Sequence, residues 1–335
     1  MTDRTLQIRK LTPAIGAEIS GVDLSRLSNS EASALHDALM AHQVIFFRDQ
    51  DMSVEQHKAL GRLFGELSVH PAAKAEVEGH PEIRVVHADE TSKTVAGEVW
   101  HSDLSCQTEP PMGSILYMHQ TPEVGGDTAF ANMYLAYDTL SEPIKKLCEG
   151  LTALHTSAHV FSKTRYGRSD KSFPEAVHPV VRTHPVTRRK CLFVNRGFTT
   201  GIMELKENES DGLLEMLLRH TETPEFQCRF RWARHSVAFW DNRCALHRAT
   251  LDYHPAVRHA HRVTIQGDRP YQPLWQLPQG NAFKKPNLIG RPSPGSNALA
   301  TGAENCLLAR NRLKGSEHGP SGAILAKTNI FERDR

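Results

Sequence analysis

Short runs of β-forming, mostly apolar residues follow one another through the middle of the chain. They are IRVVH (83–87), SILYMH (114–119), DTAFANM (127–133), CLFVN (191–195), QCRFRW (227–232), SVAFWD (236–241) and HRVTIQ (261–266). Turn-forming pairs such as Pro110-Pro111 and Gly125-Gly126 separate them. This rhythm of short strands is typical of an antiparallel sandwich or barrel, and it argues against repeated strand–helix–strand units.

Helical segments flank these runs. Two leucines four residues apart, behind a candidate serine cap, predict an amphipathic helix over 28–43. The pair Ser53 and Gln56 resembles a capping box and predicts a second helix, which runs to about residue 65. Two further stretches, 141–151 and 207–220, are predicted to be helices that cover a sheet face.

The composition excludes several classes of protein. With 335 residues, 39% hydrophobic and 23% charged, the chain is predicted to be soluble and globular with a substantial core. Its net charge of +2 gives no electrostatic reason to expect nucleic acid or a membrane as partner. Its polar start has no apolar signal core, so we expect a cytoplasmic protein. Six cysteines without a C-x-x-C pair argue against a disulfide scaffold, an iron–sulfur cluster or a thiolate zinc site.

The segment Trp100-His101-Ser102-Asp103 is the most informative short pattern. On an extended strand, residues two apart point to the same face, so His101 and Asp103 are predicted to project together. An imidazole beside a carboxylate supplies two members of the 2-His-1-carboxylate triad, which holds non-haem Fe(II) and leaves other coordination positions open. A single triplet of this kind is a weak signal in a chain with 19 histidines.

A third ligand is expected from a distant strand, because one strand cannot place three consecutive inward residues around one ion. His247 is our candidate, since it follows an apolar strand and an Asp-Asn turn. Arg258 and Arg262 come next, four residues apart on a predicted strand, so both guanidinium groups can enter one cavity. Inward-facing arginines are unfavourable unless each meets an anion, which a dicarboxylate cosubstrate and an anionic substrate would supply.

Six separated motifs extend this pattern from about residue 6 to residue 270. They are GAEISGVDLS, WHSD, GGDTAFANMYLAYDTLS, LFVNRGFTTGI, WDNRCALHRAT and HRVTIQGD. In this order they resemble the taurine dioxygenase-like (TauD/TfdA) family of Fe(II)/2-oxoglutarate-dependent dioxygenases, which also includes alkylsulfatases and aryloxyalkanoate dioxygenases. Several motifs in the order of the family are a far more specific signal than a lone H-x-D triplet.

The resemblance implies which residues bind the metal and the cosubstrate. His101, Asp103 and His247 would be the Fe(II) ligands and the catalytic centre. Arg258 would form a forked salt bridge with the distal carboxylate of 2-oxoglutarate, assisted by the hydroxyl of Thr128. The implied reaction consumes O2 and 2-oxoglutarate, releases succinate and CO2, and hydroxylates the substrate.

On the substrate side, the resemblance implies that Arg262 contacts an anionic group, with His70 and Phe198 near the same pocket. Taurine-specific members normally carry a tyrosine and an asparagine where this chain has Ala73 and Gly97. Both differences remove partners of the amine end of taurine, and a buried ammonium without partners is strongly disfavoured. We therefore expect another small organic anion, such as a sulfonate, an alkyl sulfate, or an aryloxy or other carboxylic acid.

The implied fold is mainly β with flanking helices, a double-stranded β-helix of the jelly-roll or cupin-like type. We place the catalytic domain at residues 1–273. Residues 274–335 are rich in Gly, Pro, Ser, Asn and Ala, and we expect a C-terminal extension that is mobile or contacts a second copy of the chain. Members of the family are commonly dimers or tetramers, so self-association is expected.

Two other functions fit parts of this pattern. A cupin-type binding protein would use the barrel as a ligand pocket without turnover, but it would not need three metal ligands and two inward arginines together. A zinc hydrolase with the same triad would work without oxygen and would ignore 2-oxoglutarate. Iron-dependent conversion of 2-oxoglutarate to succinate distinguishes the dioxygenase from both.

Overall fold

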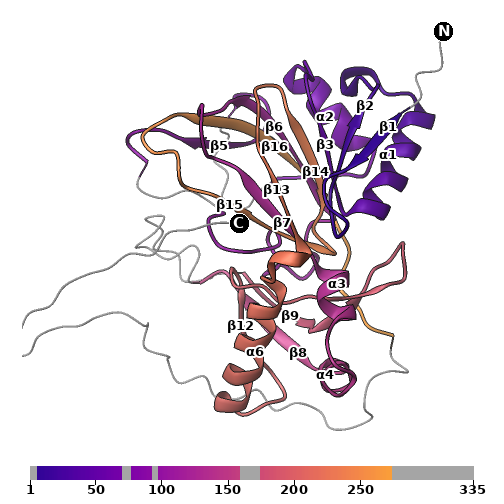
Figure 1. Cartoon of the computed structure of the whole chain (residues 1–335), viewed down its shortest axis with the longest axis vertical. Coiled ribbons are helices and arrows are strands. Elements are labelled where there is room, and N and C mark those ends of the chain that lie inside the picture. Colours follow the sequence, from indigo (N-terminus) through magenta and orange to yellow (C-terminus); the bar gives the residue numbers. More distant parts are fainter. Residues whose placement is uncertain (1–5, 70–76, 93–96, 159–173, 274–335) are drawn as a thin grey trace, which may run out of the picture. The chain divides into compact units, whose positions relative to one another are not determined.

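The computed structural model of the protein, drawn in Figure 1, describes residues 6–69, 77–92, 97–158 and 174–273. The chain divides into two units, Met1–Gly280 and Asn281–Arg335. The second unit lies wholly outside the described residues. The predicted extension 274–335 also lies outside them, so its role and the domain boundary at residue 273 stay predictions.

The largest sheet has eight strands. Seven follow the order β1, β2, β3, β14, β6, β16 and β4, and β5 pairs with β16. Their bounds are β1 (Gln7–Lys10), β2 (Ala17–Ser20), β3 (Val44–Phe47), β4 (Leu67–Ser68), β5 (Arg84–Ala88), β6 (Gly113–Gln120), β14 (Val237–Asp241) and β16 (Arg258–Ile265). All pairings in this sheet are antiparallel except that of β2 with β3.

Three smaller sheets are antiparallel throughout. Their orders are β13-β7-β15, β12-β8-β9 and β10-β11. The bounds are β7 (Thr128–Asn132), β8 (Thr152–Thr156), β9 (Glu175–Pro179), β10 (Val181–Thr183), β11 (Lys190–Leu192), β12 (Thr199–Ile202), β13 (Gln227–Phe230) and β15 (Ala245–Ala249). The predicted antiparallel architecture is therefore confirmed, with one parallel pair as the exception.

The four predicted helices begin within one residue of their predicted starts, whereas the helix that follows β7 is not predicted. The helices are α1 (Asn29–His42), α2 (Val54–Arg62), α3 (Met133–Asp138), α4 (Glu142–Cys148), α6 (Glu207–Thr221) and the short 3-10 turns η1 (Leu24–Arg26) and η2 (Pro224–Phe226). Ser28 with Glu31, and Ser53 with Gln56, form complete capping boxes, which satisfy N–H groups that a helix start leaves unpaired. The inward residues of α6 pack in one apolar cluster with β8 and β12, so this helix covers a sheet as predicted.

An apolar layer between the largest sheet and the β13-β7-β15 sheet holds the barrel together. Phe46 of β3 stacks on Phe230 of β13 with ring centroids 4.0 Å apart, and Phe130 of β7 meets Phe46 edge-on. The opposite face of the largest sheet packs on α1 and α2 in a second cluster. Two mainly antiparallel sheets packed face to face, with helices outside, form the predicted double-stranded β-helix.

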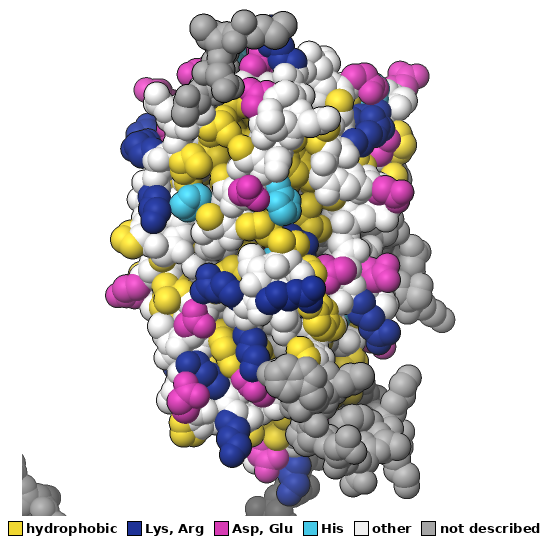
Figure 2. Space-filling model, turned by 90° about the vertical axis from the view of Figure 1, so that its right-hand side faces the viewer, with side chains coloured by type: hydrophobic (Ala, Val, Ile, Leu, Met, Phe, Trp, Pro, Cys, Tyr) yellow, Lys and Arg dark blue, Asp and Glu magenta, His cyan; other side chains and the backbone are white. Residues whose placement is uncertain are grey.

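The surface agrees with the near-neutral composition. Figure 2 shows one face on which basic and acidic side chains are interspersed. Within the described ranges, no helix is both long and apolar enough to cross a membrane.

The fully buried His155 of β8 should make the protein sensitive to acid. Burial, with the nearby His178 as the second cause, lowers the pKa of His155 from 6.5 to about 3. Between these values the unfolded chain binds a proton that the folded chain does not, so the free energy of unfolding should fall as the pH drops from about 6.5 towards 3. His155→Gln should remove this contribution, up to about 1.4 kcal/mol per pH unit. Urea unfolding across this range measures it, and an unchanged slope in the variant would contradict the prediction.

Candidate metal centre and cosubstrate pocket

The main chains of His101 and His247 pair directly, although the two residues lie far apart in the sequence. The His101 N–H donates to the His247 carbonyl at 3.1 Å, and the His247 N–H donates to the His101 carbonyl at 2.8 Å. Such a reciprocal pair holds two side chains opposite each other, and the two imidazole centroids are 4.1 Å apart. His247 lies on β15, the distant strand expected from the sequence.

The prediction that His101 and Asp103 share an extended strand is wrong. His101 forms an isolated bridge, and Asp103 lies in a turn that includes Leu104 with a φ of 46°. This turn is attached to Asn242, since the Ser102 hydroxyl donates to the Asn242 carbonyl at 2.8 Å and the Asp103 N–H donates to Asn242 Oδ1 at 3.3 Å. The side chains of His101 and Asp103 converge because of this anchored turn. The alternation of side chains along a strand does not bring them together.

The three predicted ligands come together in one cluster. Asp103 Oδ1 lies 3.8 Å from Nε2 of His101 and 3.8 Å from Nε2 of His247, and the three ligand atoms all lie within 4.8 Å of one another. His101 Nδ1 donates to the Val99 carbonyl at 2.8 Å, which leaves Nε2 unprotonated. Burial lowers the pKa of both histidines, so both are neutral ligands. Two neutral imidazoles and a carboxylate are the donor set that suits Fe(II).

Asp103 is ionised although it is buried. Burial acts most strongly on its pKa and would raise it, but the charge of Arg262 and the hydrogen bond from Ser114 hold the pKa well below its usual range. Arg262 Nη1 donates to Oδ1 at 2.7 Å, and the Ser114 hydroxyl donates to Oδ2 at 2.8 Å. Ser114 is not among the residues predicted from the sequence, because an apolar strand such as β6 carries no local signal of a contact with a distant turn.

Arg262 already has an anionic partner within the protein, because it forms an ion pair with Asp103. As predicted, Arg258 and Arg262 share one face of β16, while Val263 and Ile265 pack in the core on the other face. Because Asp103 already supplies an anion, the burial of Arg262 does not by itself require an anionic substrate. Its assignment to the substrate therefore depends on the family resemblance.

Arg258 has the surroundings of an anion receptor. Its side chain is buried, its Nε donates to the Gly126 carbonyl at 3.1 Å, and its guanidinium carbon lies 5.6 Å from the centroid of the Trp232 ring. Within the described part of the chain it forms no ion pair with a carboxylate, and burial lowers its pKa. Thr128 lies against the same indole, accepting from Trp232 Nε1 at 3.0 Å, and its own hydroxyl proton can still be donated.

Phe198 lies beside the metal cluster, with its ring centroid 6.5 Å from that of His101. The residue before it, Gly197, is required by a close approach, because a Cβ there would lie 2.7 Å from the Cβ of His101. Gly97 has a φ of +87°, and a Cβ on it would lie 3.2 Å from Cε1 of His101. His70 lies outside the described residues.

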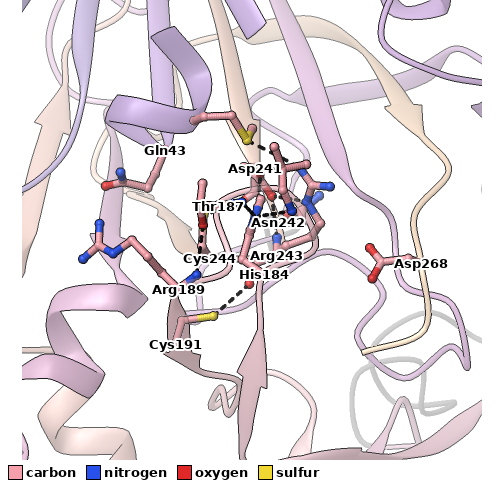
Figure 3. A network of polar contacts seen from close by, with 12 residues as sticks. Gln43, His184, Thr187, Arg189, Cys191, Asp241, Asn242, Arg243, Cys244 and Asp268 are labelled. Atoms are coloured by element: carbon pink, nitrogen blue, oxygen red, sulfur yellow. Dashed lines mark hydrogen bonds and ion pairs between the residues drawn. The ribbon is translucent and has the colours of Figure 1, made fainter. Parts of the chain in front are cut away.

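A second group of ligand-type side chains, His184, Asp241 and Cys244, is shown in Figure 3. Arg243 donates to both carboxylate oxygens of Asp241, at 2.9 and 2.7 Å. His184 Nε2 lies 3.1 Å from the same carboxylate, and its Nδ1 accepts two main-chain N–H groups. Since protein partners already occupy the carboxylate and the imidazole, this group is a buried ionic network beside the turn that leads to His247.

Known proteins resemble this chain over most of its length. The model of the taurine catabolism dioxygenase TauD, TfdA family matches residues 7–264. An alpha-ketoglutarate-dependent sulfonate dioxygenase of Saccharomyces cerevisiae is 34% identical over 83% of this chain and 71% of its own length. An alkylsulfatase of Acinetobacter baylyi is 35% identical over 78% of this chain and 86% of its own length. The crystal structure of a taurine dioxygenase from Burkholderia xenovorans matches with a TM-score of 0.71 and 36% identity, covering 80% of this chain and 93% of that chain.

Further relatives are named for a sulfate ester, a phenoxypropionate and a dichlorophenoxyacetate. The family match runs from β1 into β16, so it includes the three clustered ligands and both arginines. The predicted fold and the predicted class of enzyme are thereby confirmed. The chain belongs to the TauD/TfdA family of Fe(II)/2-oxoglutarate-dependent dioxygenases.

Proposed function

We propose that this dioxygenase hydroxylates a small organic anion, with His101, Asp103 and His247 as its iron ligands. The observation that carries the proposal is the convergence of two neutral imidazoles and one ionised carboxylate within 4.8 Å. When bound, Fe(II) supplies the redox chemistry that consumes O2 and 2-oxoglutarate. The chain's own residues position the reactants and exclude water.

Hydrogen bonds behind the ligands set their orientation. The contact of His101 Nδ1 with the Val99 carbonyl directs the Nε2 lone pair towards the cluster. Ser114 and the Asn242 side chain donate to Asp103 Oδ2, at 2.8 and 3.4 Å, while Oδ1, the oxygen nearer to the two imidazoles, accepts from Arg262 at 2.7 Å.

Arg258 and Thr128 would hold the distal carboxylate of 2-oxoglutarate. The guanidinium offers a planar pair of donors, and the threonine hydroxyl can add a third hydrogen bond. The indole of Trp232, which contacts both residues, would keep water away and strengthen the ion pair.

The names of the relatives and the residue at position 97 both bear on the substrate. The relatives act, by their names, on sulfonates, sulfate esters and phenoxy acids. Position 97 is a glycine, which offers no side-chain partner to an ammonium group, and a Cβ on it would lie 3.2 Å from Cε1 of His101. We propose that Arg262 meets the anionic head and that the rest of the substrate is larger or more apolar than taurine. Self-association and a cytoplasmic location stay predictions.

Succinate formation tests this function. Anaerobically purified protein, supplied with Fe(II), 2-oxoglutarate and then O2, should form succinate faster when an alkyl sulfate, an alkyl sulfonate or an aryloxy acid is added. Taurine should stimulate less, because its ammonium finds no partner at position 97. If taurine were the best member of the panel, the substrate proposal would be wrong. If no conditions gave succinate while Zn²⁺ supported ester hydrolysis, the dioxygenase assignment would be wrong.

The two arginines should separate binding of the cosubstrate from use of the substrate. Arg258→Ala should weaken binding of 2-oxoglutarate by about 1.5–3 kcal/mol, roughly 10- to 150-fold, because a charge-assisted forked pair is lost. Arg262→Ala, the matched variant on the same strand face, should bind 2-oxoglutarate nearly as tightly and lose mainly substrate stimulation. Calorimetric titration without oxygen, at saturating Fe(II), measures the affinities. An equal loss in both variants would contradict this division of roles.

Ser114→Ala should weaken iron binding, although Ser114 is not one of the proposed metal ligands. The variant loses the hydrogen bond to Asp103 Oδ2, and removal of such supports typically costs about 10- to 100-fold in metal affinity. Ser236→Ala removes an equally buried serine, one that contacts Arg48, and serves as the control. Competition titrations with an Fe(II) indicator under anaerobic conditions give both affinities. Equal affinities in the two variants would show that Ser114 does not support the ligand.

A further inference from the structure

Four histidines gather on the face of β16 that the metal centre does not use. His87 of β5 and His259 of β16 are direct cross-strand partners, and their Nδ1 atoms lie 3.3 Å apart. The His261 ring centroid lies 5.2 Å from that of His259, and His119 of β6 lies 4.2 Å from His261. We call these four residues the histidine patch. Strand alternation separates the patch from Arg258 and the iron ligands, which lie on the inner side.

We propose that the histidine patch binds a divalent transition-metal ion, of which Zn²⁺ is the reference case, with His87 and His259 as the first two ligands. Zinc–nitrogen bonds of about 2.0–2.1 Å in tetrahedral geometry place two nitrogen ligands roughly 3.3–3.4 Å apart. The observed Nδ1 separation of 3.3 Å agrees with this spacing. One ion can therefore meet both nitrogens without a change in the register of the strands.

A carboxylate already orients the first ligand. Asp89 Oδ2 lies 3.2 Å from His87 Nε2, so Nε2 carries the proton and Nδ1 is unprotonated on the side of His259. The Thr91 hydroxyl and N–H donate to the other oxygen of Asp89, which holds the carboxylate in place. A carboxylate hydrogen-bonded to the outer nitrogen of a histidine is the usual support of a histidine metal ligand.

The other imidazoles are available as ligands at neutral pH. Burial lowers the pKa of His119 to about 4, with His261 and His259 as the next causes, and it also lowers the pKa values of His259 and His261. His119 Nε2 is buried and has no hydrogen-bond partner among the described residues, so this ring nitrogen of the patch is unpaired there. The His87 side chain is 43% exposed, which gives an ion access from solvent.

An ion on the patch would join β5 to β16. The inner face of β16 carries Arg258 and Arg262, so the ion would stabilise the strand that presents both arginines to the pocket. This inference is independent of the proposed substrate and of the iron ligands.

Equilibrium dialysis of the full chain against Zn²⁺ tests the proposal. His87→Gln and His259→Gln keep size and hydrogen bonding but remove a ligand nitrogen, so each should weaken zinc binding to the patch at least tenfold. His36→Gln changes an exposed histidine of α1 and is the matched control. Repeating the series in a His247→Gln background removes the contribution of the first metal centre. Turnover of 2-oxoglutarate with Fe(II) should be unchanged in both patch variants.

The expected result is one more zinc ion per chain in the native protein and in His36→Gln than in either patch variant. Zinc should also raise the Tm of the His247→Gln protein, and this rise should vanish when His87 or His259 is replaced. Equal stoichiometry and affinity in all variants would overturn the proposal. Anomalous density for zinc away from these histidines, in crystals soaked with zinc chloride, would overturn it as well.

Discussion

The reciprocal main-chain hydrogen bonds between His101 and His247 are the constraint on which the site depends. Because backbone atoms make both bonds, the fold places the two imidazoles opposite each other, with ring centroids 4.1 Å apart. Asp103 then needs only one tight turn to reach the same point. Asn242 holds that turn through its carbonyl and its side chain, so the strand β14 and the strand β15 both contribute to the position of the carboxylate.

The buried ionic network beside Asn242 supports the same turn from behind. Asp241 is fully buried and stays ionised because Arg243 and His184 surround its carboxylate, although burial alone would favour the neutral acid. Loss of Arg243 would leave the buried charge of Asp241 uncompensated, which typically destabilises a protein by about 3–5 kcal/mol. The network therefore links the β10-β11 hairpin, whose loop carries His184, to the positions of the proposed iron ligands.

Alternation along β16 lets one strand serve several purposes. On the face with Arg258 and Arg262, Arg262 contacts Asp103 of the candidate metal cluster, and Val263 and Ile265 on the other face pack against the outer helices. His259 and His261 share that outer face near the start of the strand, where it pairs with β5. Substitutions on the two faces of β16 therefore affect different properties of the protein, provided that the register of β16 with β6 is kept.

The sequence by itself determined the family, the antiparallel β architecture, one capping box and one serine cap, and the types of residue at the proposed metal and cosubstrate positions, because these are encoded in local periodicity and in ordered motifs. Only the tertiary structure decided that Asp103 lies in a turn, that Ser114 and Asn242 support it, and that Arg262 pairs with it. Those contacts join segments distant in the chain. A local sequence pattern does not specify distances between segments that are far apart in the chain. The packing of the two sheets therefore determines which side chains meet.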